Sequence, residues 1–302
     1  MSTTLNSIHK RIRGFFSSDT SPSPIPMQFD TSCISADDIL EQILLRVDLK
    51  TLVRSGILVS HKWNEILSKK FFWIQRARFD GNDLSCFPPA TLEVNVPFVY
   101  WKLYYYKSFN RNLIKNHSGQ HGFDDWKIFN TGYSDRMKVE SPPLSCEPNP
   151  SIETTHCFVT SFGLSEKTII IDLQELGVDA EILDKFRPHI RVSEWVTHRN
   201  DCAAEYNLHI YLLDENSEEF PPDYDEDGLT SFHFYRKMLQ WDDLEWQKAE
   251  HVFRGYPEGI RKVKMVSTGQ DCQFWKGHYG AKMAHASVKL EFNFDERTEE
   301  SN

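Results

Sequence analysis

The sequence predicts an α+β protein in which a small helical region precedes an antiparallel β-sandwich of about ten strands. Two observations support this fold class. Between about residues 34 and 79, apolar residues recur every three or four positions, which is the spacing of an amphipathic helix. From about residue 125 the pattern changes to alternation of apolar and polar residues, which is typical of strands with one buried face.

The helical region is expected to begin near residue 36. Ser35 precedes the segment ADDILEQILLRV, and Asp38 follows three positions later, which is the arrangement of an N-cap with an acid in the first turn. The helix carries one apolar stripe, made by Ile39, Leu40, Ile43, Leu44 and Val47. Short helices are predicted within residues 48–58 and 60–79, and helices of this length need partners. The stripe therefore either closes an internal three-helix core or docks helices of another protein.

Residues 80–110 are expected to link the two regions. The segment DGNDLSCFPPATLEVNVP is typical of a linker, and FVYWKLYYYKSFNRNL is predicted to form a helix that starts after Pro97. The aromatic residues of this helix lie on nearly every side, so we expect it to be packed between two domains.

The second region contains several short strands separated by turns. Two alternating segments define faces that should be buried. These faces are made by Tyr206, Leu208, Ile210 and Leu212, and by Val288, Leu290, Phe292 and Phe294. Only the segment AEILDKF is predicted to be helical within this region. Eight acids lie between Asp214 and Asp227, but they lack the ligand spacing and central glycine of a calcium loop, so a solvated loop is expected.

Composition and motifs exclude several classes of function. The formal net charge of -10 argues against binding to duplex nucleic acid. There is no apolar run long enough to span a membrane. The six cysteines include no CxxC pair, which indicates reduced thiols and no zinc site. No nucleophile, phosphate-binding or metalloprotease motif is present, so neither catalytic residues nor a metal or cofactor are expected.

The first 18 residues contain no acid and place several cations among apolar residues. This pattern is typical of a mitochondrial presequence, but a disordered basic tail is the interpretation that we prefer.

The segment GQDCQFWKGHYG, residues 269–280, places two large aromatic residues side by side between glycines. Neighbouring residues of a strand point to opposite faces, so Phe274 and Trp275 cannot share one buried face of a regular strand. Glycines allow the chain to bend. The segment is therefore either a core strand that is interrupted by glycines or a loop that presents an aromatic surface.

Residues 34–73 resemble an F-box. The resemblance rests on a hydrophobic start, an acidic first helix, spaced apolar residues and two tryptophans, Trp63 and Trp73. The chain departs from the family at two places, where Ile34-Ser35 and Val47-Asp48 stand instead of Leu-Pro. The resemblance implies binding to a Skp-type adaptor, and through it to the cullin of an SCF ubiquitin ligase. The residues expected to bind the adaptor are Ile34, Ile39, Leu40, Ile43, Leu44, Val47, Leu52 and Val59.

Residues from about 110 to 294 resemble the F-box-associated domain of the sugar-binding F-box proteins. The matching segments include NLIKN, FVTSFGLSEKTIIIDLQELG and YPEGIRKVKMVSTGQDCQFWKGHYGAKMAHASV, in the order of the family. The resemblance implies a jelly-roll-like sandwich. The expected organisation is a disordered tail at 1–30, an F-box at 31–79, a helical linker at 80–110, the sandwich at 111–295 and a second tail at 296–302.

The same resemblance implies a site for the inner N-acetylglucosamine pair of N-glycans. Its expected residues are Phe162, Phe274, Trp275 and Lys276. Phe274 replaces the usual tyrosine of the family, whereas Lys276 is retained. The implied function is a non-catalytic, cytoplasmic substrate receptor that binds misfolded proteins bearing high-mannose N-glycans for ubiquitination and degradation.

Two alternatives remain open. In the first, the ligase role is kept, but the loops bind a protein surface without a glycan. In the second, the sandwich is an enzyme, for which His278, Asp271 and His198 are the nearby titratable candidates. Nothing in the pattern of residues favours the enzyme.

Overall fold

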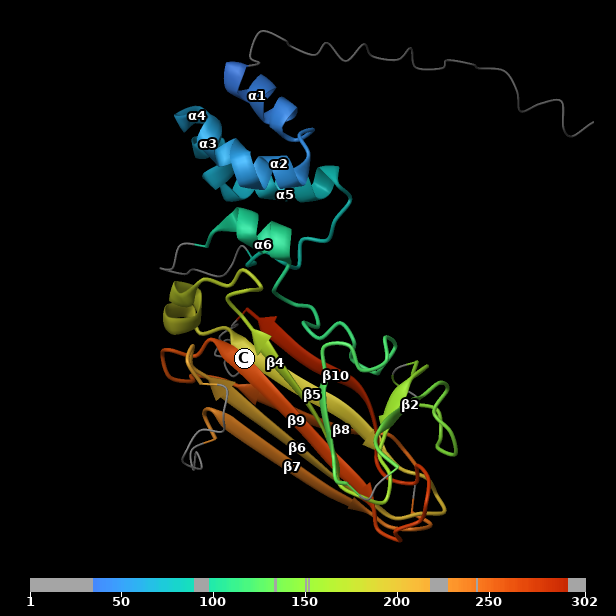
Figure 1. Ribbon diagram of the computed structural model, residues 1–302. Helices are drawn as coiled ribbons and strands as arrows, with labels where there is room; N and C mark the ends of the chain where they lie inside the picture. Colours follow the sequence, from blue (N-terminus) through green and yellow to red (C-terminus); the bar gives the residue numbers. More distant parts are fainter. Residues whose placement is uncertain are drawn as a thin grey trace, which may run out of the picture. The chain divides into compact units, whose positions relative to one another are not determined.

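The computed structural model of the protein describes residues 35–89, 98–132, 135–149, 151, 153–217, 228–242 and 244–292 (Figure 1). The chain divides into two compact units, residues 1–44 and 45–302. Several expectations lie outside the described residues. They concern the two terminal tails, most of the acidic loop, Ile34, Pro97 and Phe294.

The described part of the first unit is helix α1, Ala36–Leu44, with Ser35 before it. The hydroxyl of Ser35 accepts the backbone N–H of Asp38 at 3.2 Å. In return, the Asp38 carboxylate accepts the backbone N–H of Ser35 at 2.9 Å. This reciprocal capping confirms the predicted start of the helix.

The second unit begins with short helices. They are α2 (Leu49–Thr51), the π-helical turn η2 (Leu52–Gly56), α3 (Ile57–Val59), α4 (His61–Ser68), α5 (Lys70–Phe79) and α6 (Tyr100–Tyr106). Asp48 caps α2 by accepting the N–H of Thr51, and Ser60 caps α4 by accepting the N–H of Trp63. Asp48 therefore starts a helix at the position where the F-box pattern has proline.

Polar contacts fasten α5 to its neighbours. The indole N–H of Trp73, which is fully buried, donates to the carbonyl of Leu67 at 2.7 Å. Arg76 donates to the carbonyl of Val47 at 2.6 Å and pairs with Asp80 at 2.7 Å. Tyr104 of α6 donates its hydroxyl proton to the same carboxylate of Asp80. The linker helix is thus held against α5.

The linker segment also contacts the loop before η3, Ile182–Phe186. Lys102 pairs with Asp179, and Ser108 donates to the carbonyl of Leu176. A Cβ atom at Gly177 would lie 2.2 Å from the ring of Tyr106, so only glycine allows this close approach. Residues on both sides of the helix therefore hold it. These contacts all lie within the second unit, so the expected packing of the helix between two domains stays a prediction.

Within the described residues, the sandwich consists of two five-stranded antiparallel sheets. The first has the order β1 (Lys127–Asn130), β4 (Ser165–Asp172), β9 (Lys262–Asp271), β6 (Ala204–Leu213) and β7 (Ser231–Met238). The second has the order β2 (Lys138–Glu140), β3 (Cys157–Val159), β10 (Lys282–Glu291), β5 (His189–Thr197) and β8 (Gln247–Phe253). The predicted α+β class with an antiparallel sandwich is confirmed.

The alternating patterns identified the core correctly. The β6 face made by Tyr206, Leu208, Ile210 and Leu212 is buried. Val288, Leu290 and Phe292, which continue the second predicted face, are also buried. Phe292 stacks on Phe109 with ring centroids 4.3 Å apart, so the end of this face packs against the chain that follows α6.

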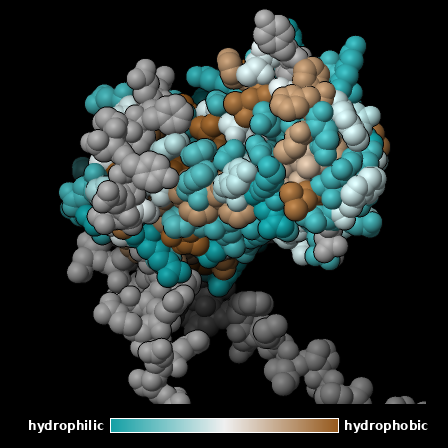
Figure 2. Space-filling model, turned by 90° about the horizontal axis from the view of Figure 1, so that it is seen from below, coloured by the Kyte–Doolittle hydropathy of each residue, from teal (hydrophilic) through white to brown (hydrophobic). Residues whose placement is uncertain are grey.

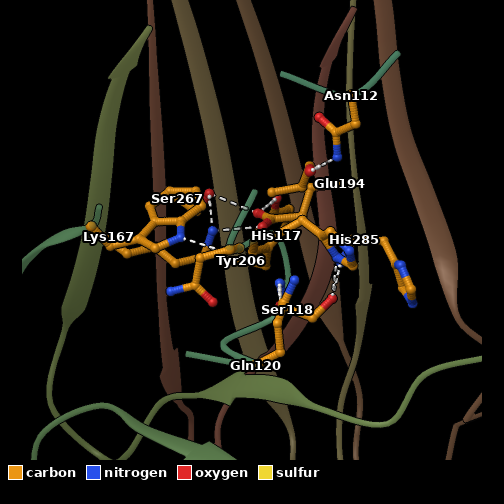
Figure 3. Close-up of polar contacts among 12 residues, drawn as sticks. Asn112, His117, Ser118, Gln120, Lys167, Glu194, Tyr206, Ser267 and His285 are labelled. Carbon is orange, nitrogen blue, oxygen red and sulfur yellow. Dashed lines mark hydrogen bonds and ion pairs between the residues drawn. The ribbon is translucent and has the colours of Figure 1, made fainter. Parts of the chain in front are cut away.

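A polar network crosses the interior between the sheets (Figure 3). Lys167 of β4 and Glu194 of β5 are both fully buried and form an ion pair at 2.6 Å. The hydroxyls of Tyr206 and Ser267 each donate to Glu194 at 2.7 Å. Burial lowers the pKa of Lys167, and the adjacent Glu194 carboxylate opposes that shift. Each carboxylate oxygen of Glu194 is therefore matched by at least one donor, as a buried charge requires.

Candidate functional site

The aromatic segment forms a loop between β9 and β10 at one end of the sandwich. Phe274 is 72% exposed and Trp275 is 41% exposed, and Lys276 is also exposed. Figure 2 looks onto this end and shows hydrophobic residues interspersed with hydrophilic ones. The loop interpretation of the segment is therefore the right one, and its side chains are accessible to a ligand.

Asp271, the last residue of β9, sets the start of the loop. Its side chain is fully buried, and its Oδ1 atom accepts the backbone N–H groups of Gln273 at 3.0 Å and Phe274 at 2.5 Å. Phe274 has a φ of 57°, a left-handed conformation that is uncommon for a residue other than glycine. The carboxylate therefore stabilises the backbone turn that directs Phe274 outward.

The second oxygen of the same carboxylate, Oδ2, is buried and has no hydrogen-bond partner among the described residues. Burial raises the pKa of Asp271, and the backbone N–H donors at Phe274 and Gln273 act in the opposite direction. The carboxylate that holds the start of the loop therefore has hydrogen-bond donors on one oxygen, Oδ1, and none on the other, Oδ2, among the described residues.

The far side of the loop is fastened to the segment that precedes β2. The N–H of Gly277 donates to Asp135 at 2.6 Å, and the His278 ring bonds the carbonyl of Arg136 at 3.0 Å. Gly277 has a φ of 119°, which only glycine adopts readily. The residues between Asp271 and Gly277 are consequently held at both ends.

Trp275 is positioned by a row of side chains. Its ring meets the Tyr279 ring edge to face, with centroids 5.6 Å apart. The guanidinium of Arg199 lies 4.2 Å from the centre of the Tyr279 ring, and Asp201 binds that guanidinium through two hydrogen bonds of 2.9 Å. The Asp201 carboxylate raises the pKa of Arg199, so the cation stays charged. This row orients the indole without covering it.

Phe162 lies in a loop at the same end of the sandwich. The carbonyl of Ser161 accepts the N–H of Asp271 at 2.9 Å, and the carbonyl of Thr160 accepts the N–H of Gly280 at 3.1 Å. These bonds attach the Phe162 loop to both ends of the aromatic loop. Phe162 itself is half-buried. The structure thus brings together the loops that carry the four residues expected to bind a glycan.

Several residues that support the loop were not predicted from the sequence. Tyr279, four positions after Trp275, could have been found from its aromatic character. Asp135 and Arg136 could not, because 142 positions separate each from its partner in the loop. Asp271 was considered only as a possible catalytic group.

The three titratable side chains proposed for an enzyme bond backbone groups. His198 is buried and bonds the carbonyl of Leu239 at 3.0 Å, and His278 and Asp271 make the backbone contacts given above. Burial lowers the pKa of both histidines. Within the described part of the chain, no three His, Cys, Asp or Glu side chains come together as metal ligands. The contacts of these three side chains support the backbone at this end of the sandwich.

The residues expected to bind the adaptor differ in exposure. Ile39, Ile43 and Val59 are more than half exposed, Leu40 and Val47 are half-buried, and Leu44 and Leu52 are fully buried. The exposed side chains could contact a partner protein directly. The assignment of all of these residues to adaptor binding stays a prediction.

Comparison with known proteins decides the family. A family model described as FBA, the F-box associated region, matches residues 104–290. The chain belongs to the F-box-associated family. F-box only protein 6 of Mus musculus is 32% identical over 259 residues, which cover 83% of this chain and 81% of the relative. F-box only protein 27 of Mus musculus is 30% identical over 277 residues, covering 88% and 93% of the two chains.

Among solved structures, TmCBM61 in complex with beta-1,4-galactotriose matches with a TM-score of 0.38 and 15% identity. The match covers 60% of this chain and 99% of that one.

Membership in the F-box-associated family assigns the chain a substrate-recognition role rather than a catalytic one. The expectation of a non-catalytic protein therefore agrees with the family. None of the helices in the described ranges has the length and apolar character needed to cross a membrane.

Proposed function

We propose that this F-box-associated protein is the substrate receptor of an SCF-type ubiquitin ligase and binds the inner N-acetylglucosamine pair of high-mannose N-glycans. The observation that carries the proposal is the exposed Phe274–Trp275 pair, held by Asp271 on one side and by Tyr279 and Arg199 on the other.

The chemistry of the loop suits an uncharged sugar. A pyranose ring has an apolar face of C–H groups and a rim of hydroxyls. An aromatic ring can cover the face and exclude water, while an ammonium and backbone groups bond to the rim. Trp275 and Phe162 would supply the aromatic surface, and Lys276 would supply the ammonium. Phe274 would add area but would lack the hydroxyl that the family usually has at this position.

The clients in this proposal are misfolded glycoproteins. High-mannose N-glycans are added in the lumen of the secretory pathway, so a cytoplasmic receptor would meet them on proteins exported for degradation. Ubiquitin transfer itself would be carried out by other subunits of the ligase, recruited through the Skp-type adaptor and the cullin.

The sugar site can be tested by titrating chitobiose into the full chain and following the amide signals of residues 272–280 by NMR. Saturable shifts that change little between about 50 and 500 mM salt are expected, because screening acts on charges and the sugar has none. An absence of shifts at millimolar sugar would remove the glycan from the proposal.

The ligase role can be tested by charging the exposed side of α1. Ile43→Asp should abolish capture of the Skp-type adaptor while the circular dichroism spectrum is retained, because Ile43 is 52% exposed and an aspartate there stays solvated. Leu44→Asp is the contrasting variant, since a carboxylate at this fully buried position should also unfold the region. A folded Ile43→Asp protein that binds the adaptor like the wild type would contradict the assignment.

One observation favours a protein surface as the second candidate ligand. Leu239 and Trp241 are 52% and 68% exposed in the loop after β7, and the N–H of Trp241 donates to Asn200, next to Arg199. Large apolar side chains therefore continue from the aromatic loop onto a neighbouring loop. Loss of client binding in Trp241→Ala with chitobiose binding unchanged would support direct contact with the client polypeptide.

A further inference from the structure

A small cavity of about 180 Å³ lies on the outer side of the second sheet. Its walls come from β5, β8 and β10 and from the loop that follows α6. The lining residues are Asn112, His117, Ser193, Trp195, Lys248, His285, Ser287 and Lys289. No part of this lining belongs to the aromatic loop or to the residues proposed to bind a glycan.

The cavity lies beside an irregularity in β10. The register with β5 shifts between Ala284 and Ser287, and His285 has a φ of 54°, which is unusual for this residue type. Bulges of this kind redirect a side chain and are frequent beside functional sites. Here the bulge brings the His285 ring onto the His117 ring, with centroids 5.1 Å apart and planes at 21°.

Hydrogen bonds from the loop hold the bulge in place (Figure 3). The N–H of His285 donates to the Ser118 hydroxyl at 2.9 Å, and the N–H of Ala286 donates to the carbonyl of His117 at 3.0 Å. Asn112 donates to the carbonyl of Ala286 at 2.9 Å and accepts the N–H of Val288 at 3.2 Å. These hydrogen bonds therefore hold the wall of the cavity in place independently of a ligand.

Hydrogen-bond donors without a partner converge on this cavity. Ser193 and Ser287 are opposite each other in the pairing of β5 with β10. Ser193 is only 6% exposed, yet its hydroxyl has no hydrogen-bond partner within the described ranges, and the same holds for Ser287 and for the ammonium of Lys289. The Ser193 hydroxyl is not one of the fully enclosed polar atoms that lack a partner, so water can reach it, and a ligand with acceptor atoms could take the place of that water.

The charge around the cavity is suited to an anion. Lys248 and Lys289 line it. Lys248 pairs with Glu250 at 2.5 Å, and Arg191 pairs with Glu291 at 2.8 Å and with Glu250 at 3.5 Å. Lys289 is therefore the lining cation that has no carboxylate partner within the described ranges. Burial lowers the pKa of His117 and His285, so the two imidazoles are neutral at pH 7 and the lysines supply the positive charge. The balance of charge at the cavity is positive in a chain whose net charge is -10.

We propose that this cavity binds a phosphate group, either as inorganic phosphate or as a phosphomonoester. Its volume is about 180 Å³. That suits a phosphate with its first substituent, and it is below the range of about 300–1,000 Å³ that drug-sized ligands occupy. The oxygens of a phosphate would accept from the Ser193 and Ser287 hydroxyls, and Lys289 would supply a charge-assisted bond. This site is separate from the proposed glycan site.

The test is a titration of the full chain with inorganic phosphate and with O-phosphoserine at constant ionic strength, followed by the ring signals of His117 and His285 in NMR spectra. Saturable shifts are expected with phosphate and not with chloride at the same ionic strength. Tighter binding of phosphoserine would identify a phosphomonoester as the ligand, and equal or weaker binding would identify the free anion. No saturable shift up to about 20 mM phosphate, or equal shifts with chloride, would overturn the proposal.

Two variants locate the binding site. Lys289→Gln and Ser287→Ala should each weaken phosphate binding by at least about fivefold, as expected for loss of a charge-assisted or neutral hydrogen bond. Lys237→Gln, at an exposed lysine of β7 on the other sheet, is the matched control and should bind like the wild type. Chitobiose binding should stay unchanged in all three. Unchanged phosphate affinity in both Lys289→Gln and Ser287→Ala would contradict the site.

Discussion

In the interior of the sandwich, the ammonium of Lys167 lies 3.7 Å from the centre of the Trp126 ring. At the loop end, the guanidinium of Arg199 lies 4.2 Å from the centre of the Tyr279 ring. The first pair is enclosed, and its charge is matched by Glu194. The second pair supports Trp275, which stays 41% exposed. The same contact between a cation and a ring therefore stabilises the fold in one place and positions a surface for a ligand in the other.

Mutations in the interior and at the loop end should therefore affect different properties of the protein. A defect in the interior should reduce the free energy of unfolding, because a buried group left without its partner has no water to replace it. A defect in the loop should reduce ligand affinity and leave the fold nearly unchanged, because the exposed groups are already solvated. Substitutions in the two regions can separate these effects.

The largest effect is expected from Glu194→Ala. It leaves Lys167 buried without its partner and removes the acceptor of the Tyr206 and Ser267 hydroxyls. Breaking a buried ion pair in this way lowers the free energy of unfolding by about 3–5 kcal/mol. Urea unfolding followed by tryptophan fluorescence measures this loss.

The matched control is Glu205→Ala, which removes a partly exposed carboxylate paired with Lys237 on the outer face of β6. This substitution should lower the free energy of unfolding by less than about 1 kcal/mol. Equal losses in the two variants would show that the interior network has no special importance for stability.

The second effect is expected from Trp275→Ala in the loop. Chitobiose affinity should fall by about thirty-fold, or roughly 2 kcal/mol, because the largest aromatic surface of the proposed site is lost. The free energy of unfolding should change by less than about 0.5 kcal/mol. Calorimetric titration and urea unfolding of the same preparation give both numbers. Phe129→Ala, at a 59% exposed aromatic residue of β1, should leave both unchanged.

Lys276→Ala should have a smaller effect on the same ligand. An exposed ammonium that bonds one sugar hydroxyl contributes about 1 kcal/mol, which is about fivefold in affinity. The measurement is again a chitobiose titration. A loss larger than that of Trp275→Ala would mean that charge rather than aromatic surface dominates recognition.

The smallest effect is expected from Asp271→Asn, and it should appear in the pH dependence of stability. Burial raises the folded-state pKa of Asp271 above its unfolded value, so the folded state binds the proton more tightly. This group therefore stabilises the fold increasingly as the pH falls from the folded pKa toward the unfolded one. The asparagine variant has no such proton to bind.

Urea unfolding at pH 7 and pH 4 checks this prediction. The free energy of unfolding of the wild type, minus that of Asp271→Asn, should become more positive at pH 4. A difference between the two proteins that stays constant with pH would show that the pKa of Asp271 is not raised.

Local patterns in the sequence were sufficient for the fold class and for most of the core. Local neighbours determine both the cap made by Ser35 and Asp38 and the alternating faces of β6 and β10. Because these neighbours lie within a few positions in the sequence, they can be read from helix and strand periodicity. The family resemblance likewise pointed to the loop that holds Phe274 and Trp275. What these patterns could not provide is the set of contacts between distant segments.

The tertiary structure decided how the loop and the interior are supported. The sequence alone marked residues 269–280 as either a strand or a loop, and the bonds from Gly277 to Asp135 and from His278 to Arg136 hold them as a loop. The pairing of Lys167 with Glu194 and the stacking of His117 on His285 likewise join segments that no local pattern connects. Such contacts depend on which strands become neighbours and in which register, and only packing of the two sheets determines this.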